Sequence, residues 1–385
     1  MVSKKGLLGI GVAMLAAIIV ALWLAYSPAD RSGDTTSIQI GAVLPLTGSA
    51  AVWGQNAKMG MDLALKEIND KGGVRNRKLV VLYEDSQSES KPATSALQKL
   101  ISSNHIQVVI GDIASSSVLA MAPIAESNKV VLLSPGASNP DISNAGDFIF
   151  RNWQSDALEG EVDARYAFSE LKWKRVACLF VSNAYGTGLT KVFAQTFKKL
   201  GGEIVKEESF LQDATDIRAQ IASVAATKPD GIFMPGYPPE MAKALKQMKE
   251  LGVSIPILSV QAFDDPEIVK LAGNAAEGVV FSVPKPPDTK DPVVAGFRAK
   301  YIATYGKEPG VTSDTGYDAL RIVASALESG ASTGPEIQKV MANLKDFPGA
   351  AGLTTFDRHG DVVRDFVFRT ILNGKPVAIA NRVDR

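Results

Sequence analysis

The chain has 385 residues, of which 46% are hydrophobic, and its 41 lysines and arginines balance 41 aspartates and glutamates. This length exceeds the size at which a single hydrophobic core stops growing, so two domains are expected. The balanced charge, without a long basic run, argues against nucleic acid as a partner. Two histidines and one cysteine leave too few ligands for a transition-metal site. No metal and no cofactor are expected.

Residues 1–36 form a separate segment. Two lysines precede an apolar run that continues to about Ala25, and a polar stretch follows. This order is typical of a secretory signal, with Ser27-Pro28-Ala29 as a candidate cleavage site. The apolar run is also close to the roughly 20 residues that span a bilayer, so an uncleaved N-terminal anchor is the alternative. The single Cys178 excludes an intramolecular disulfide, and export without disulfides favours a bacterial periplasmic or cell-envelope protein.

Strand-like and helix-like segments alternate after the leader. In the first series we expect strands at 38–44, 78–83, 107–110 and 130–133 and helices at 52–71, 92–102 and 118–127. In the second series we expect strands at 175–181, 203–210, 231–234, 255–260 and 278–283 and helices at 158–168, 188–200, 215–227 and 240–251. Such alternation predicts parallel sheets covered by helices on both faces. The fold class is therefore α/β, with two doubly wound parallel-sheet lobes.

The last third of the chain follows a different pattern. Helical patterns at 293–305, 314–329 and 333–344 follow one another without strands, and an Asn373-Gly374 turn predicts a C-terminal hairpin. We place these helices on the first lobe and the hairpin on the second, so the chain crosses three times between the lobes. Three such segments form a hinge that permits bending. The expected division is 37–155 with 285–352 for lobe 1, and 156–284 with 353–385 for lobe 2.

Two serine-rich turns each follow a short apolar strand, at 111–117 and at 134–138. Ligands of open α/β sheets bind at the carboxyl ends of strands, where both turns are expected. The first turn runs into a helix, whose dipole and free N–H groups suit a carboxylate. The alternative is that Ser115 to Ser117 only cap the helix. A second serine cluster at the next strand end favours an anion site.

Several motifs occur in a specific order and spacing. They are Ile40-Gly41-Ala42-Val43-Leu44-Pro45-Leu46-Thr47-Gly48, Glu67-Ile68-Asn69-Asp70-Lys71-Gly72-Gly73-Val74, the two serine turns, Tyr185-Gly186-Thr187-Gly188 and Ala276-Glu277-Gly278. Together they resemble the type I periplasmic solute-binding proteins, in particular the branched-chain amino acid binding family of ABC importers. The resemblance covers about residues 38–380. It implies a two-lobed, monomeric receptor that closes on a small amino acid-like ligand and delivers it to an ABC permease.

The resemblance also implies which residues hold the ligand. Its carboxylate-binding positions match the two serine turns, and its ammonium-binding acid matches Asp156, for which a helix N-cap is the alternative. Its aromatic cleft walls match three residues in loops or at strand ends, for which packing of the loop is the alternative. The expected ligand-binding residues are Trp53, Ser115, Ser116, Gly136, Ala137, Ser138, Asp156, Tyr185, Tyr237 and Gln261.

Gln261 is a departure from the family pattern, because the leucine-binding members have a second acidic residue there. Glutamine accepts a hydrogen bond but carries no charge, so the site has a single countercharge for an ammonium group. Relatives of this family bind amides, small organic acids and other amino acids. The ligand class therefore stays open among these.

No set of residues indicates an enzyme. His105 and His359 are predicted in exposed turns, and neither pairs by spacing with Cys178 as a base with a nucleophile. The Gly-rich stretch at 185–188 lacks the lysine of a phosphate-binding loop. The alternative to an importer subunit is a tethered sensory receptor or regulator that binds amides or small organic acids.

Overall fold

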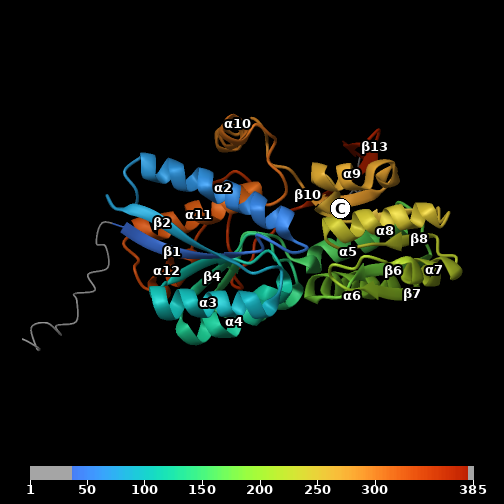
Figure 1. Cartoon of the computed structure of the whole chain (residues 1–385), viewed down its shortest axis with the longest axis horizontal. Coiled ribbons are helices and arrows are strands. Elements are labelled where there is room, and N and C mark those ends of the chain that lie inside the picture. Colours follow the sequence, from blue (N-terminus) through green and yellow to red (C-terminus); the bar gives the residue numbers. More distant parts are fainter. Residues whose placement is uncertain (1–36, 380–385) are drawn as a thin grey trace, which may run out of the picture.

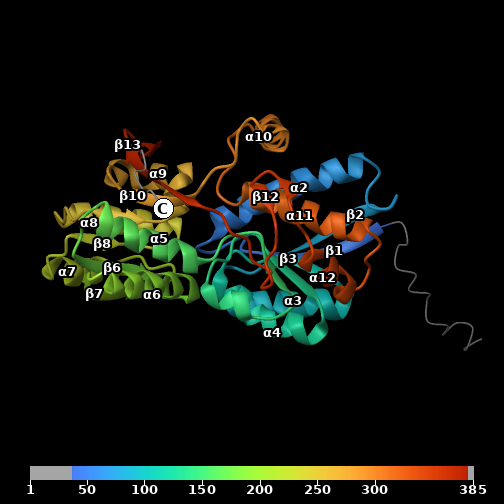
Figure 2. The ribbon, with the colours of Figure 1, turned by 180° about the vertical axis from the view of Figure 1, so that it is seen from behind.

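The computed structural model describes residues 37–379, and the expected leader at 1–36 lies outside them. Figure 1 shows two α/β lobes side by side, and Figure 2 shows the same arrangement from behind. The predicted α/β class with two lobes is confirmed. Within residues 37–379, no helix combines the length and the apolar character needed to cross a membrane.

Lobe 1 is built on a five-stranded sheet in the order β2-β1-β3-β4-β5. All of its strand pairs are parallel, and the strands β3 and β4 are buried over their whole length, as expected for a sheet covered on both faces. Its strands are β1 (Ser37–Leu44), β2 (Lys78–Asp85), β3 (Val108–Gly111), β4 (Val131–Ser134) and β5 (Ile149–Arg151), and its first helices are α2 (Ala51–Asp70), α3 (Ser90–Asn104) and α4 (Ser115–Asn128).

Lobe 2 is built on a seven-stranded sheet in the order β14-β13-β10-β9-β8-β6-β7. Its parallel strands are β6 (Arg175–Val181), β7 (Glu203–Phe210), β8 (Gly231–Phe233), β9 (Ile257–Ser259) and β10 (Val280–Pro284). Its helices are α5 (Asp156–Ser169), α6 (Ala184–Lys199), α7 (Arg218–Ala226), α8 (Pro238–Glu250) and α9 (Pro266–Ala272).

The predicted C-terminal hairpin is present in lobe 2. The strands β13 (Phe366–Leu372) and β14 (Lys375–Ala378) pair antiparallel, and β13 joins the edge strand β10 of the parallel series. Asn373 and Gly374 both have positive φ, at 51° and 69°, which is the conformation of a two-residue hairpin turn.

Three further helices cover lobe 1, as the sequence predicts. They are α10 (Pro292–Tyr305), α11 (Ser313–Glu328) and α12 (Gly334–Ala342). The helix α11 lies directly on α2, and Gly60 of α2 leaves room for the backbone of Ser313, which a Cβ atom at this position would strike. The helix α10 is fixed by the Tyr305 hydroxyl, which donates to the carbonyl of Met59 at 2.9 Å.

The lobes are joined by three chain segments, which confirms the expected hinge. The chain leaves lobe 1 after β5, returns after β10, and leaves again after the short hairpin of β11 (Phe347–Gly349) and β12 (Gly352–Thr354). The first and third segments run in parallel, through a bridge between Gln154 and Val362. The exact lobe boundaries given above stay a prediction.

Candidate ligand-binding site

The two serine turns meet at the carboxyl edge of the lobe 1 sheet. The Ser115 Oγ accepts the backbone N–H groups of Ser138 and Asn139, each at 3.2 Å. Both serines are almost fully buried, with 1% and 3% of their surface exposed. Because the Ser115 hydroxyl already accepts two hydrogen bonds, its remaining capacity is to donate its own proton. The turns that the sequence predicts to converge are therefore in contact, around a hydroxyl oriented to donate.

The backbone N–H groups of the second turn donate to serine side chains of the two turns. The Ser134 Oγ accepts the N–H groups of Gly136 and Ala137, at 3.3 Å and 2.8 Å, and Ser115 takes the next two N–H groups. This is the local side-chain to backbone bonding that serine favours in turns. The assisting N–H groups that the resemblance implies at Gly136, Ala137 and Ser138 are thus occupied. None of these three N–H groups of the second turn is therefore left for a ligand.

The first turn also contacts lobe 2. The Ser116 Oγ accepts the backbone N–H of Ala184 at 3.1 Å, at the start of α6. The amide nitrogen of Asn139 donates to the carbonyl of the same Ala184 at 2.6 Å. The serine turns therefore lie at the interface between the lobes, where a ligand of both lobes would bind.

Three aromatic side chains meet across that interface. The ring centroids of Trp53 and Tyr237 lie 5.5 Å apart edge to face, and those of Tyr185 and Tyr237 lie 5.6 Å apart in a stack. Trp53 belongs to lobe 1 and the two tyrosines to lobe 2. All three are buried, and the Trp53 Nε1 and the Tyr185 hydroxyl have no hydrogen-bond partner. The three expected aromatic positions are thus in one place.

The expected helix at 52–71 is present as α2, which begins at Ala51 and includes Trp53, so the description of Trp53 as a loop residue is wrong. The start of α6 was likewise expected too late, at 188, whereas the helix begins at Ala184 and carries Tyr185 in its first turn. Tyr237 immediately precedes α8. The aromatic residues are therefore positioned by the first turns of three helices, which are more rigid supports than loops.

Asp156 is the first residue of α5, two residues before the predicted start of this helix, and it is fully buried. It does not cap the helix, since Ser155 is the N-cap residue and accepts the N–H of Ala157. Its own N–H donates to the carbonyl of Ser138 at 2.8 Å, and the Ser138 hydroxyl lies beside its carboxylate, but neither carboxylate oxygen has a hydrogen-bond partner of normal geometry. Burial raises the pKa of Asp156 to about 7, against the lowering effect of the Ser138 hydroxyl and Arg151. The expected ammonium-binding acid is thus present and unpaired.

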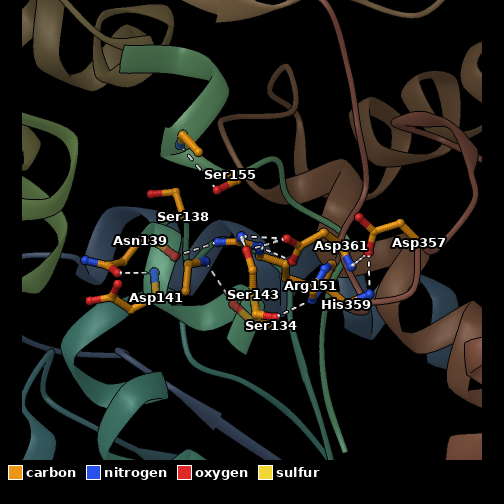
Figure 3. A network of polar contacts seen from close by, with 12 residues as sticks. Ser134, Ser138, Asn139, Asp141, Ser143, Arg151, Ser155, Asp357, His359 and Asp361 are labelled. Atoms are coloured by element: carbon orange, nitrogen blue, oxygen red, sulfur yellow. Dashed lines mark hydrogen bonds and ion pairs between the residues drawn. The ribbon is translucent and has the colours of Figure 1, made fainter. Parts of the chain in front are cut away.

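The Arg151 guanidinium, which lies near Asp156, forms its hydrogen bonds with other groups, as Figure 3 shows. It forms a bidentate pair with Asp361, at 2.6 Å and 2.9 Å, on the third hinge segment. Its other contacts are with the Asn139 carbonyl at 2.9 Å and the Ser143 Oγ at 2.7 Å. Every nitrogen of this fully buried guanidinium donates to one of these groups. Arg151 therefore fixes the hinge to lobe 1 and leaves the Asp156 carboxylate without a direct partner.

Sequence reasoning missed two acidic residues beside Asp156. Glu159 and Asp163 follow on the same face of α5, at spacings of three and seven residues, and both are fully buried. Burial and the repulsion of Asp163 and Asp156 raise the pKa of Glu159, and burial also raises that of Asp163. A stripe of acids on a helix ordinarily indicates a solvated face, so the sequence offers no signal of this burial.

Gln261 lies in the short 3-10 helix of Gln261–Asp264 and faces the hinge. Its Oε1 is 3.4 Å from the Nε2 of Gln154, and only 5% of its surface is exposed. Together with Trp153 and Arg364 it lines a cavity of about 380 Å³. Among the expected site residues, only Gln261 lines this cavity, which we call the hinge cavity.

The lobes are closed on each other in this structure. The Asn56 amide donates to the Asp265 carboxylate at 3.1 Å, and the Gln212 amide donates to the carbonyl of Ser88 at 3.0 Å. The Ser49 Oγ donates to the Glu240 carboxylate at 2.6 Å. These contacts join residues of lobe 1 to residues of lobe 2 outside the three hinge segments, so they exist only while the lobes are together.

Among the described residues, no group of three histidine, cysteine or acidic side chains is arranged to hold a metal ion. Cys178 is buried in β6, and burial raises the pKa of its thiol, as expected for a core residue. The chemistry of the site is therefore that of hydroxyls, carboxylates and aromatic rings.

Comparison with known proteins identifies the family. The family model described as periplasmic binding protein matches residues 37–375. The leucine-specific-binding protein of Salmonella typhimurium is 29% identical over 346 residues, which are 88% of this chain and 91% of that protein. It and its fellow relatives are binding proteins, in agreement with the expectation that this chain is not an enzyme.

Solved structures agree with the family match. A leucine-binding protein of Thermotoga maritima has a TM-score of 0.83 and 31% identity, over 89% of this chain and 98% of that one. A branched-chain amino acid binding protein of Streptococcus pneumoniae, solved with isoleucine, has a TM-score of 0.82 and 29% identity, over the same shares of the two chains. The resemblance seen in the sequence motifs is confirmed, and the chain belongs to the periplasmic binding protein family.

Proposed function

We propose that this protein is the substrate-binding subunit of an ABC importer and captures a small amino acid between its two lobes. One observation carries the proposal. A buried hydroxyl that must donate, that of Ser115, and a buried carboxylate without a cationic partner, that of Asp156, both lie against Ser138 at the lobe interface. A donor and an anion so close together suit the carboxylate and the ammonium of one zwitterion.

The ligand would bind lobe 1 first, at the serine turns and Trp53. Closure then brings Tyr185 and Tyr237 of lobe 2 over it and forms the contacts that join the lobes. A ligand shifts the open–closed equilibrium only through interactions that differ between the two states, so ligands that fail to contact lobe 2 should bind weakly. The aromatic rings would then exclude water from the charged head group.

The relatives named above support the remaining parts of the proposal. A leucine-specific-binding protein and a branched-chain amino acid transporter subunit indicate an amino acid ligand and a membrane permease as the partner. We propose a periplasmic or envelope-anchored location, and a monomer as the active form.

The test is a thermal-shift screen with amino acids, amides and small organic acids, followed by calorimetry on Ser115→Ala. A ligand that binds only the native state raises the melting temperature. Loss of a hydrogen bond to a charged group should weaken binding by about 1.5–3 kcal/mol. The matched control is Ser127→Ala, an exposed serine of the same helix whose hydroxyl bonds only its own helix. Equal affinity of both variants and the wild type would refute the site.

A further inference from the structure

The acidic face of α5 is a buried polar region with few hydrogen-bond partners. We call Asp156, Glu159 and Asp163 the α5 acid row. Both carboxylate oxygens of Asp156 and of Asp163, and one of Glu159, are buried without a hydrogen-bond partner. The remaining Glu159 oxygen accepts the Ser282 hydroxyl of β10 at 3.0 Å, and the same hydroxyl lies close enough to Asp163 to lower its pKa against the effect of burial.

Two hydroxyls of the neighbouring helix α6 are in the same condition. The Tyr185 Oη and the Thr190 Oγ1 are buried and unpartnered, with 4% and 1% of each residue exposed. Burial raises the pKa of the Tyr185 phenol, and the charges of Glu159, Asp156 and Asp163 raise it further. The helices α5 and α6 pack closely here, since a side chain at Gly160 would strike Val192. The unpartnered Tyr185 hydroxyl therefore lies near the unpartnered acids of α5.

This region lacks a counter-charge within the protein. Burying an ion without a partner is far costlier than burying a neutral group. Arg151 donates to Asp361, Asn139 and Ser143, and among the described residues no lysine or arginine forms an ion pair with the α5 acid row. Burial raises the pKa of all three acids and so favours their neutral forms without a ligand, whereas a cation from outside the chain would favour their charged forms and occupy the free acceptors.

The shape of the row indicates which kind of cation fits. Glu159 lies about one helical turn, roughly 5 Å along the axis, beyond Asp156, and Asp163 lies about one turn further. The three carboxyls are not arranged to surround a metal ion. Free carboxylate oxygens call for N–H donors, which an ammonium or guanidinium group has and a quaternary ammonium group lacks.

We propose that the α5 acid row binds the cationic side chain of a basic amino acid, and so selects lysine, ornithine or arginine over neutral amino acids. This rests on the proposed function, since the Ser115 hydroxyl would hold the α-carboxylate and Asp156 the α-ammonium. The side chain then extends along α5 toward Glu159 and Asp163. The neutral Gln261 is consistent with a site whose negative charge lies instead on α5.

The first experiment is calorimetry on the wild-type protein with lysine, ornithine, arginine, Nε-acetyl-lysine and leucine. We expect the three cationic ligands to bind at least tenfold more tightly than the two neutral ones. Equal or tighter binding of leucine or Nε-acetyl-lysine would overturn the selectivity and leave the proposed function intact. If none of the five bound, and no other amino acid raised the melting temperature, both proposals would fall.

The second experiment uses Glu159→Gln and Asp163→Asn, which keep the shape of the side chains. Each variant should lose about tenfold or more in affinity for lysine and keep its affinity for Nε-acetyl-lysine. Glu161→Gln is the matched control, because Glu161 lies on the exposed face of α5 and pairs with Arg165 at 2.7 Å. The variants should fold, since each replaces a buried acid by a neutral group of the same shape, and their melting temperatures without ligand should not fall. An unchanged preference for lysine in both would contradict the proposal.

Discussion

The two sides of the lobe interface differ in how their polar groups are satisfied. On lobe 1, the hydroxyls of Ser115 and Ser134 accept four backbone N–H groups, and Arg151 is fully bonded. On lobe 2, the α5 acid row keeps most of its carboxylate oxygens without partners. Although the Trp53 Nε1 of lobe 1 is also unpartnered, the comparison shows a largely preformed surface on lobe 1 and a region that needs a ligand on lobe 2. Lobe 1 should therefore be rigid without ligand, and lobe 2 should respond to it.

The largest expected effect comes from Asp361→Ala, which removes the ion pair between Arg151 and Asp361. This change leaves the fully buried Arg151 without its counter-charge, and removal of one partner of a buried pair costs about 3–5 kcal/mol. Chemical denaturation without ligand measures it. The exposed pair of Glu161 and Arg165 is the control, and Glu161→Ala should change stability by less than about 1 kcal/mol. Similar small losses in both variants would show that the hinge network is not stabilising.

The buried Asp156 of lobe 2 should make the stability of the protein depend on pH. The pKa of Asp156 is raised from 3.8 to about 7, so between these values the native protein keeps a proton that the unfolded chain releases. This contribution to stability is full below the lower value and is lost as the pH rises through the upper one, at about 1.4 kcal/mol per pH unit for one group. Asp156→Asn should remove it.

The measurement is the denaturation free energy of wild type and Asp156→Asn at intervals from pH 4 to pH 8. Taking the difference between the two proteins cancels the groups that titrate alike in both. We expect the difference to favour the wild type progressively less as the pH rises. A difference that is constant across this range would contradict a buried, protonated Asp156.

A smaller effect is expected from Asn56→Ala, which removes a hydrogen bond between the lobes. Because that bond exists only in the closed state, the change should weaken ligand binding by about 1 kcal/mol, roughly fivefold in Kd. Gln55→Ala is the control, since Gln55 bonds to Leu46 within lobe 1. Titration calorimetry with the best ligand of the screen compares the two. Equal losses of ligand affinity in the two variants would mean that the hydrogen bond between Asn56 and Asp265 does not favour the closed state.

Much of the fold could be predicted from the sequence. The apolar runs and their alternation with helical patterns predict the two lobes, and the Asn373-Gly374 turn predicts the last hairpin, because these signals are local. The strand β5 was missed because three residues give no period. The early turns of α6 were missed because Tyr185-Gly186-Thr187-Gly188 favours helix poorly, and the Asn183 side chain supplies the cap by accepting the N–H of Gly186.

The site could be predicted only in part. The serine turns were located because strand ends of an α/β sheet meet at one edge. The occupied N–H groups of the second turn depend on a contact between Ser115 and Ser138, which lie in different turns. The burial of Glu159 and Asp163 depends on how α5 packs against α6 and β10, which no local pattern encodes. Tertiary packing thus decides which polar groups remain free for a ligand.

The most direct test of the account is a crystal structure with the tightest ligand of the screen. We predict density between the closed lobes, with the ligand carboxylate within hydrogen-bonding distance of the Ser115 Oγ and its ammonium at the Asp156 carboxylate. A ligand bound instead in the hinge cavity beside Trp153 and Arg364, with the serine turns unoccupied, would contradict it.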